Sequence, residues 1–297
     1  MSKVKGIFFA MFSSAAFGLM PILAKFAYKY GINSITLVFL RFFFAWIVIL
    51  PILMWRKTDL KLTKKELIAV GFTGIFTYGA TSLMLFISFS YISGGLAMTM
   101  HFIYPVVVTL ISIIFFKEKL YWKKAIALIL SSIGVFLLVY NGEIQLNFAG
   151  VFFAMVSGIS YSLYIVSIDR SSLRNIDSFK LTFYLSIAAS ISIFIFGKST
   201  GDLNLKLDFR CYVLALLIAI IATVIAATVF QIGIKIIGAS NASILSTFEP
   251  TVSMILGVIV LKEVVNFKII IGCILILSSV ILIAKAYSKD TELLENE

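Results

Sequence analysis

Glu249 is the residue whose type and position point most directly to chemistry. It lies near the middle of an apolar run over 240–261 and directly precedes Pro250. If that run spans a membrane, a carboxyl group at this depth is costly, faces the interior of the helix bundle and marks a functional site by default. Such a group could take a proton from one side and release it on the other, so Glu249 is the proton-coupling candidate. A structural ion pair or a hydrogen-bonded helix anchor would explain the same residue.

Two prolines predict irregular backbone at corresponding places in the chain. Pro105 and Pro250 each lie inside an apolar run. Proline has no N–H and clashes with the carbonyl four residues earlier, so each helix should kink and the carbonyls of His101 and Ser246 should lose their usual partners. Such carbonyls are tolerated at membrane depth where they line a cavity, which favours a binding site or a gate. A packing kink is the alternative.

His101 and Arg41 are two further ionisable residues within apolar runs. His101 is the single histidine of the chain. It cannot form a zinc site by itself, because ordinary sites need three or four ligands, and no metal is expected. A hydrogen-bonded core residue is favoured over a proton relay. Arg41 lies inside the run 34–55, where its charge predicts a pairing with a carboxylate of either the protein or the substrate.

Polar and aromatic side chains at helical spacing complete the candidate site. Small and hydroxylated helix faces commonly mediate packing in membranes. The faces that carry Tyr161, Tyr164 and Gln231 are instead interpreted as borders of a cavity. The predicted substrate pathway comprises Glu249, Pro250, Pro105, His101, Arg41, Ser246, Tyr104, Tyr161, Tyr164 and Gln231.

The composition shows which solvent surrounds these residues. Of 297 residues, 61% are hydrophobic and 13% are charged, and the mean hydropathy is +1.08. Soluble domains are ~45–50% apolar and ~25% charged, so a soluble enzyme, a secreted scaffold and a disordered chain are excluded. The net charge of +11 is spread over separated loops, which indicates loops that face the cytoplasm and not a nucleic-acid surface. The two cysteines have no CxxC or Cys/His companion, so no disulfide is expected.

The apolar runs predict an all-α integral membrane protein. A membrane helix needs ~20 mostly apolar residues. Ten segments qualify, at about 6–27, 34–55, 67–90, 95–116, 123–141, 149–169, 178–197, 211–235, 240–261 and 267–286. The loops on the N-terminal side hold most of the 25 lysines and arginines, so both termini should be cytoplasmic.

The chain also matches itself in one register. Gly6–Ser13 reappears as Gly150–Ser157, and Pro105 with Lys117-Glu118 corresponds to Pro250 with Lys262-Glu263. Three matches at an offset near 145 residues indicate a duplication. Five spans are an odd number, so the second half must enter the membrane from the opposite side. We therefore predict ten transmembrane helices as two five-helix inverted repeats, over 6–141 and 149–286, with a polar cytoplasmic tail over 287–297. In carriers of this design the substrate site lies near midplane at the repeat interface.

With these motifs the chain resembles the EamA family of the drug/metabolite transporter superfamily, a family of ten-span carriers. The similarity extends from Gly6 to Ala286, and its specific pieces are Arg41-Phe42, Pro105 with Lys117-Glu118, and Phe248-Glu249-Pro250 with Lys262-Glu263. Halves of this family usually end the fourth helix in Gly-Glu, whereas both halves here have Lys in place of Gly. The resemblance implies a small-molecule exporter or permease and leaves the cargo open.

Together these features predict a secondary transporter in the cell membrane. We expect an exporter of small metabolites such as amino acids that works by alternating access, with proton coupling through Glu249 as a second layer. A lipid-handling, flippase-like subunit or a non-transport membrane scaffold is the alternative. The motifs HExxH and GxSxG are absent, so neither an enzyme nor a cofactor is expected. The expected partners are a small-molecule substrate and the lipid bilayer, without nucleic acid, and the chain would act as a monomer or a homodimer.

Overall fold

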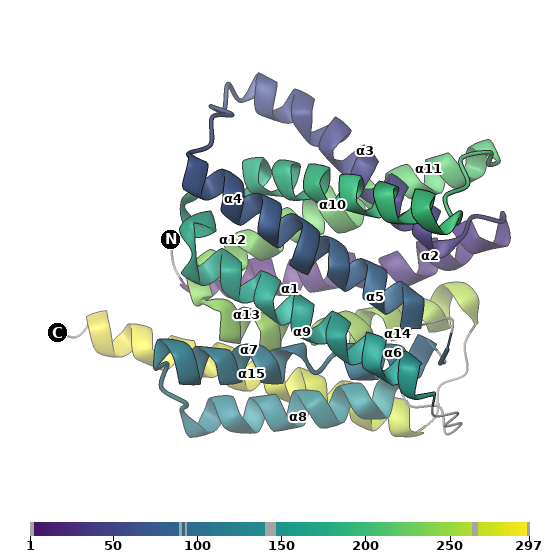
Figure 1. Ribbon diagram of the computed structural model, residues 1–297. Helices are drawn as coiled ribbons and strands as arrows, with labels where there is room; N and C mark the ends of the chain where they lie inside the picture. Colours follow the sequence, from purple (N-terminus) through teal and green to yellow (C-terminus); the bar gives the residue numbers. More distant parts are fainter. Residues whose placement is uncertain (1–2, 89–90, 93, 140–146, 263–266, 296–297) are drawn as a thin grey trace.

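The apolar segments of this protein are helical, as a lipid environment requires of a backbone that spans it. The computed structural model describes residues 3–88, 91–92, 94–139, 147–262 and 267–295, and these ranges contain helices and no strand (Figure 1). In hydrocarbon every backbone N–H and C=O must find a partner within its own segment, and a helix meets this condition. The all-α expectation is confirmed for these ranges.

The helices of the first half follow the predicted spans closely. Their bounds are α1 (Lys3–Gly18), α2 (Met20–Lys29), α3 (Ser34–Trp55), α4 (Lys64–Phe72), the π-helix η1 (Thr73–Gly79), α5 (Ala80–Ser88), α6 (Gly94–His101), α7 (Tyr104–Phe116) and α8 (Trp122–Val139). Residues 89–90 of the predicted third span and 140–141 of the fifth lie outside the described ranges.

The second half has the same order of spans, except that its first span is the single helix α9 and a short turn, η2, follows it. Its elements are α9 (Phe148–Arg170), the 3₁₀ turn η2 (Ser172–Asn175), α10 (Ser178–Thr200), α11 (Phe209–Ile218), the π-helix η3 (Ala219–Ala227), α12 (Thr228–Ile237), α13 (Ala239–Leu245), α14 (Phe248–Leu261) and α15 (Phe267–Glu295). The last helix therefore continues beyond the predicted boundary at 286 into the polar tail.

Membrane-spanning length is reached by most of the predicted segments. Within the described part of the chain, nine helical segments are long and apolar enough to cross a membrane. They correspond to all predicted spans except 123–141, where α8 runs from Trp122 to Val139 beside α15. The chain is therefore a multi-pass membrane protein.

Several spans are interrupted at corresponding places in the two halves. The fourth predicted span breaks between α6 and α7, and the ninth breaks between α13 and α14. The third and eighth spans each contain a π-helix, η1 and η3. After α7 and α14 the chain turns through a left-handed lysine, Lys117 with φ 53° and Lys262 with φ 59°. The first span breaks as well, between α1 and α2.

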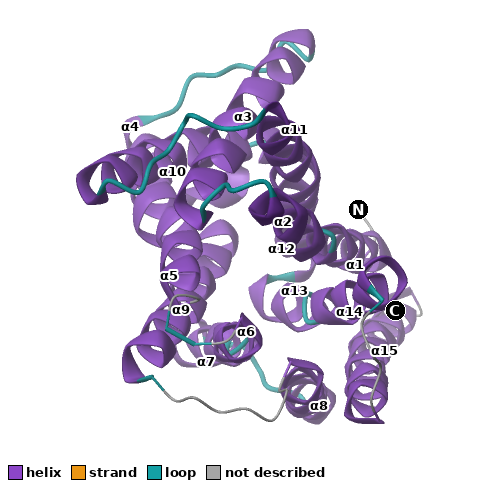
Figure 2. Cartoon of the chain, turned by 90° about the vertical axis from the view of Figure 1, so that its right-hand side faces the viewer, coloured by secondary structure: helices purple, strands orange, loops and turns teal. Residues whose placement is uncertain are grey.

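Each major helix contact joins the two halves of the chain. Helix α3 packs on α10, and α8 packs on α15. Helix α1 packs on α12 and α14, and α9 packs in the corresponding way on α5 and α7. Figure 2, which looks along many of the helices, shows these partners side by side. The halves are therefore interleaved and share one core.

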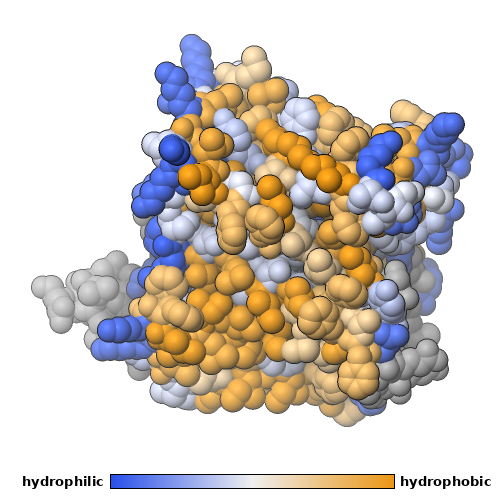
Figure 3. Space-filling view, viewed as in Figure 1, coloured by the Kyte–Doolittle hydropathy of each residue, from blue (hydrophilic) through white to orange (hydrophobic). Residues whose placement is uncertain are grey.

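The surface has an apolar belt between two polar edges. Figure 3 shows hydrophobic side chains across the middle of the molecule and hydrophilic ones at its two opposite ends. Both chain ends lie at one of these ends, together with the connections α3–α4, α7–α8, α9–α10 and α12–α13 (Figure 1). We call this end the N-terminal face, and the other end the opposite face.

Candidate functional site

The two broken helices bring predicted site residues from both halves together. Tyr104 is the first residue of α7, and Ser246 lies in the break between α13 and α14. The Tyr104 Oη and Ser246 Oγ atoms are 2.6 Å apart, and both residues are buried. By sequence, Tyr104 and Glu249 hold equivalent positions, each directly before a proline. The candidate site is therefore built where the two halves meet.

The prolines begin new helices and do not kink continuous ones. Pro105 lies in the first turn of α7, and Pro250 is the third residue of α14. A proline is tolerated in the first turn because its missing N–H would have no partner there. The Ser246 carbonyl loses its usual partner at position 250, as expected, but it accepts the Glu249 N–H at 3.1 Å instead. A tighter turn supplies the hydrogen bond that Pro250 cannot.

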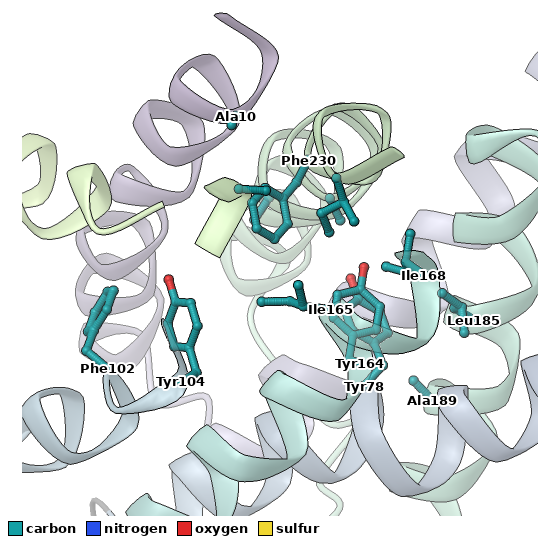
Figure 4. Close-up of a cluster of buried hydrophobic side chains, with 14 of the residues drawn as sticks. Ala10, Tyr78, Phe102, Tyr104, Tyr164, Ile165, Ile168, Leu185, Ala189 and Phe230 are labelled. Carbon is teal, nitrogen blue, oxygen red and sulfur yellow. The ribbon is translucent and has the colours of Figure 1, made fainter. Parts of the chain in front are cut away.

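A series of aromatic rings extends from the first break into the bundle. Ring centroids are 5.5 Å apart for His101 and Tyr104, 4.8 Å for Tyr104 and Tyr161, and 5.6 Å for Tyr161 and Tyr164. Tyr164 then stacks on Tyr78 at 4.8 Å. In Figure 4 the rings of Tyr78 and Tyr164 overlap and their hydroxyl groups point the same way, while Tyr104 lies on the far side of Ile165. We call Tyr104, Tyr161, Tyr164 and Tyr78 the tyrosine ladder.

A buried amide oxygen lies beside this ladder. Gln231 is fully buried, and its Nε2 donates to Tyr164 Oη at 3.2 Å. Among the described residues Gln231 Oε1 has no hydrogen-bond partner of good geometry, whereas Tyr78 Oη lies within reach of Arg41 and Thr223. Leaving a buried polar atom unpaired costs about 1–3 kcal/mol, so such atoms indicate a place for water or a ligand.

Arg41 is a buried cation that is held by neutral side chains in the described part of the chain. Its side chain is 6% exposed, its Nε donates to Thr223 Oγ1 at 2.9 Å, and its Nη1 lies 3.2 Å from Met20 Sδ. The guanidinium carbon is 5.1 Å from the centroid of the Phe42 ring. Among the described residues no carboxylate oxygen lies within 4.0 Å of it. Because a guanidinium has five N–H donors, several remain available to an anion.

Glu249 is half-buried in the first turn of α14. It lies within electrostatic range of Arg41, Tyr104 and Tyr161. No basic side chain of the described ranges forms an ion pair with it, so the explanation as a structural ion pair has no support. Helix α1 packs directly on this turn, where a Cβ on Gly18 would lie 3.0 Å from the Glu249 carbonyl oxygen.

His101 is held by its neighbours in the way expected of a core histidine. It is buried, and its Nδ1 lies 2.9 Å from Ser157 Oγ. The Ser157 hydroxyl donates to the Ala154 carbonyl at 2.6 Å, so it would accept a hydrogen bond from a protonated Nδ1. Its Nε2 is then left as an acceptor.

Three residues that sequence reasoning did not place in the site belong to it. Tyr78 extends the tyrosine ladder, Thr223 holds Arg41, and Ser157 holds His101. The sequence does offer a sign that Tyr78 borders the site, because it is a polar aromatic residue beside Gly79 in an apolar run. The roles of Thr223 and Ser157 depend on contacts between the halves, which the sequence does not show.

A hollow lies apart from this cluster, on the opposite face. It has a volume of about 400 Å³ and is lined by Asn33, Ser34, Ile35, Phe86, Ile87, Tyr91, Phe196 and Asp202. None of these residues was predicted as part of the site.

Comparison with known proteins gives one family. The model of the EamA-like transporter family matches residues 4–140 and again residues 148–285. An uncharacterized transporter of Synechocystis is 28% identical over 70% of this chain and 64% of the relative. An uncharacterized transporter of Archaeoglobus fulgidus is 26% identical over 89% and 94% of the two chains, and YyaM, an uncharacterized transporter of Bacillus subtilis, is 25% identical over 92% and 90%. A solved crystal structure matches with a TM-score of 0.83 at 15% identity and covers 97% of this chain and 99% of the other, which shows a shared fold.

Proposed function

Because the chain belongs to the EamA-like transporter family, we propose that it is a secondary transporter that exports small metabolites such as amino acids by alternating access. The observation that carries this proposal is the contact of Tyr104 with Ser246, which joins two interrupted helices from different halves. Interrupted helices at the interface of repeats form the substrate sites of many secondary carriers. The transported molecule would lie against the tyrosine ladder, Arg41 and Glu249.

The proposed architecture is ten spans in two inverted five-helix repeats, over 6–141 and 149–286. Corresponding interruptions in the two halves support it, as do the paired contacts of α1 with α12 and of α9 with α5. We place both termini in the cytoplasm of a cell-membrane protein, because basic residues are concentrated in the loops of the N-terminal face.

We further propose that transport is coupled to proton movement through Glu249. A carboxyl group that is half-buried, lies near a buried arginine and has no ion pair can change its protonation state when the cavity changes sides. In each transport cycle it would bind a proton on one side and release it on the other.

Metabolite profiling of cells that express the intact protein or its Glu249→Gln form tests this function. We expect a small polar or amphipathic metabolite to accumulate in the medium only with the intact protein. Glu66→Gln is the matched control, because Glu66 is an exposed acid at the start of α4 and should leave export unchanged. If Glu249→Gln exports equally well, Glu249 is structural and proton coupling is lost from the proposal. If no metabolite differs between expressing and empty cells, the export proposal fails and lipid handling becomes the better explanation.

A further inference from the structure

Asp169 is a buried carboxylate on the N-terminal face, five residues after Tyr164 of the tyrosine ladder in α9. It is 2% exposed, although it lies in the last turn of α9, where the helix dipole disfavours a negative charge. Three donors compensate it. The Ala239 N–H at the start of α13 lies 3.1 Å away, Arg170 Nε lies 3.0 Å away, and the Arg174 guanidinium forms an ion pair with the same carboxylate.

The contacts of Arg174 continue into α12. Its Nη2 donates to the Lys235 carbonyl oxygen at 2.9 Å. In return, Lys235 Nζ donates to the Ile176 carbonyl oxygen at 2.5 Å and to Ser178 Oγ at 3.0 Å. The connection between α9 and α10 is therefore fastened to the end of α12 and the start of α13.

Glu118 carries the same network into the first half of the chain. It belongs to the Lys-Glu pair that follows α7 and pairs with Lys124 in α8. Its other oxygen lies 3.7 Å from Arg170 Nη2, and the Arg170 guanidinium lies over the ring of Phe116 at 5.1 Å. We call Glu118, Lys124, Asp169, Arg170 and Arg174 the ionic network.

Two of the half-helices connect this network to the candidate site. Helix α7 runs from Tyr104 in the site toward Glu118 in the network, and α13 runs from Ala239, whose N–H donates to Asp169, to the break at Ser246. The two half-helices pack on each other, with Thr109 Oγ1 and Ser240 Oγ 3.0 Å apart. Movement of this pair away from α9 would require the ionic network to break.

The Glu118–Arg170 pair, which joins the end of α7 to α9, can separate at low cost. The side chains of Glu118 and Arg170 are 25% and 35% exposed, so water can replace this ion pair. Ion pairs at this exposure contribute little to stability, and they can break and re-form as a structure changes. The ion pairs of the buried Asp169 need not break, because Arg170 and Arg174 lie in α9 and in the turn that follows it.

The hollow of about 400 Å³ lies at the other end of the molecule, on the opposite face.

We propose that the ionic network is the cytoplasmic gate of the transporter, and that it locks the α7–α13 pair against α9 when the cytoplasmic side is closed. This inference rests on the proposed function and orientation. In the described structure the gate is closed, and its release exposes the interface of α7 and α13 to the cytoplasm. Glu118 links the first half to the second through its contact with Arg170. Asp169 binds both Arg170 and the Ala239 N–H, and so holds the start of α13 against α9.

Cysteine accessibility measures the state of this gate without a known cargo. The reporter is Ser240→Cys, a fully buried position between network and site, in a chain that also carries Cys211→Ser and Cys273→Ser. Inside-out vesicles are labelled with a membrane-impermeant methanethiosulfonate. We expect Glu118→Gln to raise the labelling rate about fivefold or more, the range of a coupled conformational shift. Asp169→Asn should raise it further.

Arg56→Gln is the matched control. It breaks the ion pair of Arg56 with Asp177, 3.7 Å long and exposed on the same face, and should leave labelling unchanged. The gate is refuted if Glu118→Gln labels no faster than Arg56→Gln. If Asp169→Asn does not fold, Glu118→Gln tests the gate by itself. Glu118 is partly exposed, so its substitution should leave the protein folded. Faster labelling of Glu118→Gln without any exported metabolite would support the gate and contradict the proposed export of small metabolites.

Discussion

Arg41 shows how a single charged side chain can be kept inside an apolar helix bundle. Its strongest contact is the hydrogen bond from Nε to Thr223 Oγ1, which crosses from α3 to the π-helix η3. In a low-dielectric interior a hydrogen bond to a charged group is stronger than one between neutral groups. Thr223 therefore holds the guanidinium in place while other N–H donors stay available to a ligand.

Thr223→Val removes this acceptor at nearly constant volume. We expect a loss of about 1.5–3 kcal/mol in the free energy of unfolding, because the Arg41 Nε–H is left buried without its partner. The midpoint of thermal unfolding of the purified protein in detergent should fall accordingly. Thr200→Val, at the exposed end of α10, is the control and should change stability by less than about 0.5 kcal/mol. Equal midpoints for the two variants would mean that Thr223 does not hold Arg41.

Among the helices, the two interrupted spans depend on close approach of a neighbour. At the first break a Cβ on Gly158 of α9 would lie 2.6 Å from the His101 carbonyl oxygen and 2.9 Å from Ile103 Cγ2. A backbone atom cannot move aside as a flexible side chain can, so only glycine fits at this position. The α6–α7 break and the face of α9 are thus matched to each other.

Gly158→Ala should destabilise the protein by about 1–3 kcal/mol, since overpacking forces the backbone at the break to shift. Gly71→Ala in α4 is a matched control, because nothing lies within 4 Å of the added Cβ. That variant should gain about 0.5–1 kcal/mol from the lower entropy of the unfolded chain. Thermal unfolding of both variants in detergent makes the comparison. Two variants of equal stability would show that the approach of α9 to the break is loose.

Across the whole molecule, the interleaving of the halves determines what can move. Because α1 packs on α12 and α9 packs on α5, neither half has a core of its own. A rigid rotation of one complete half against the other would separate these contacts. Movement of half-helix pairs, such as α7 with α13, disturbs fewer of them.

The orientation of the molecule is testable directly. The concentration of basic residues predicts both termini in the cytoplasm, so the N-terminal face should be the cytoplasmic one. A green fluorescent protein fused after Glu297 should fluoresce, and alkaline phosphatase at the same position should be inactive. Alkaline phosphatase inserted in the α10–α11 connection, at Asp202, should be active. The reverse pattern would place the ionic network outside and overturn the assignment of a cytoplasmic gate.

Local properties of the sequence predicted the spans and the irregular backbone near Pro105 and Pro250. Apolar runs specify helices because lipid offers no partner for the backbone, and Pro105 and Pro250 remove a hydrogen bond wherever they occur. Ser246 was singled out for this reason, and in the structure its Oγ lies 2.6 Å from Tyr104 Oη. The π-helices were not predicted, since their sequences contain no proline and read as ordinary apolar helix.

The neighbours of each polar side chain depend instead on how the two halves interleave. Arg41 and Thr223 are 182 positions apart, Asp169 and Ala239 are 70 apart, and no local pattern relates them. Lipid tails are as apolar as aliphatic side chains, so an apolar helix face is equally stable against lipid and against another helix. Hydropathy therefore does not determine which helices pack together. Close backbone contacts at glycines and a few buried hydrogen bonds make that selection, and both arise only when the helices have packed.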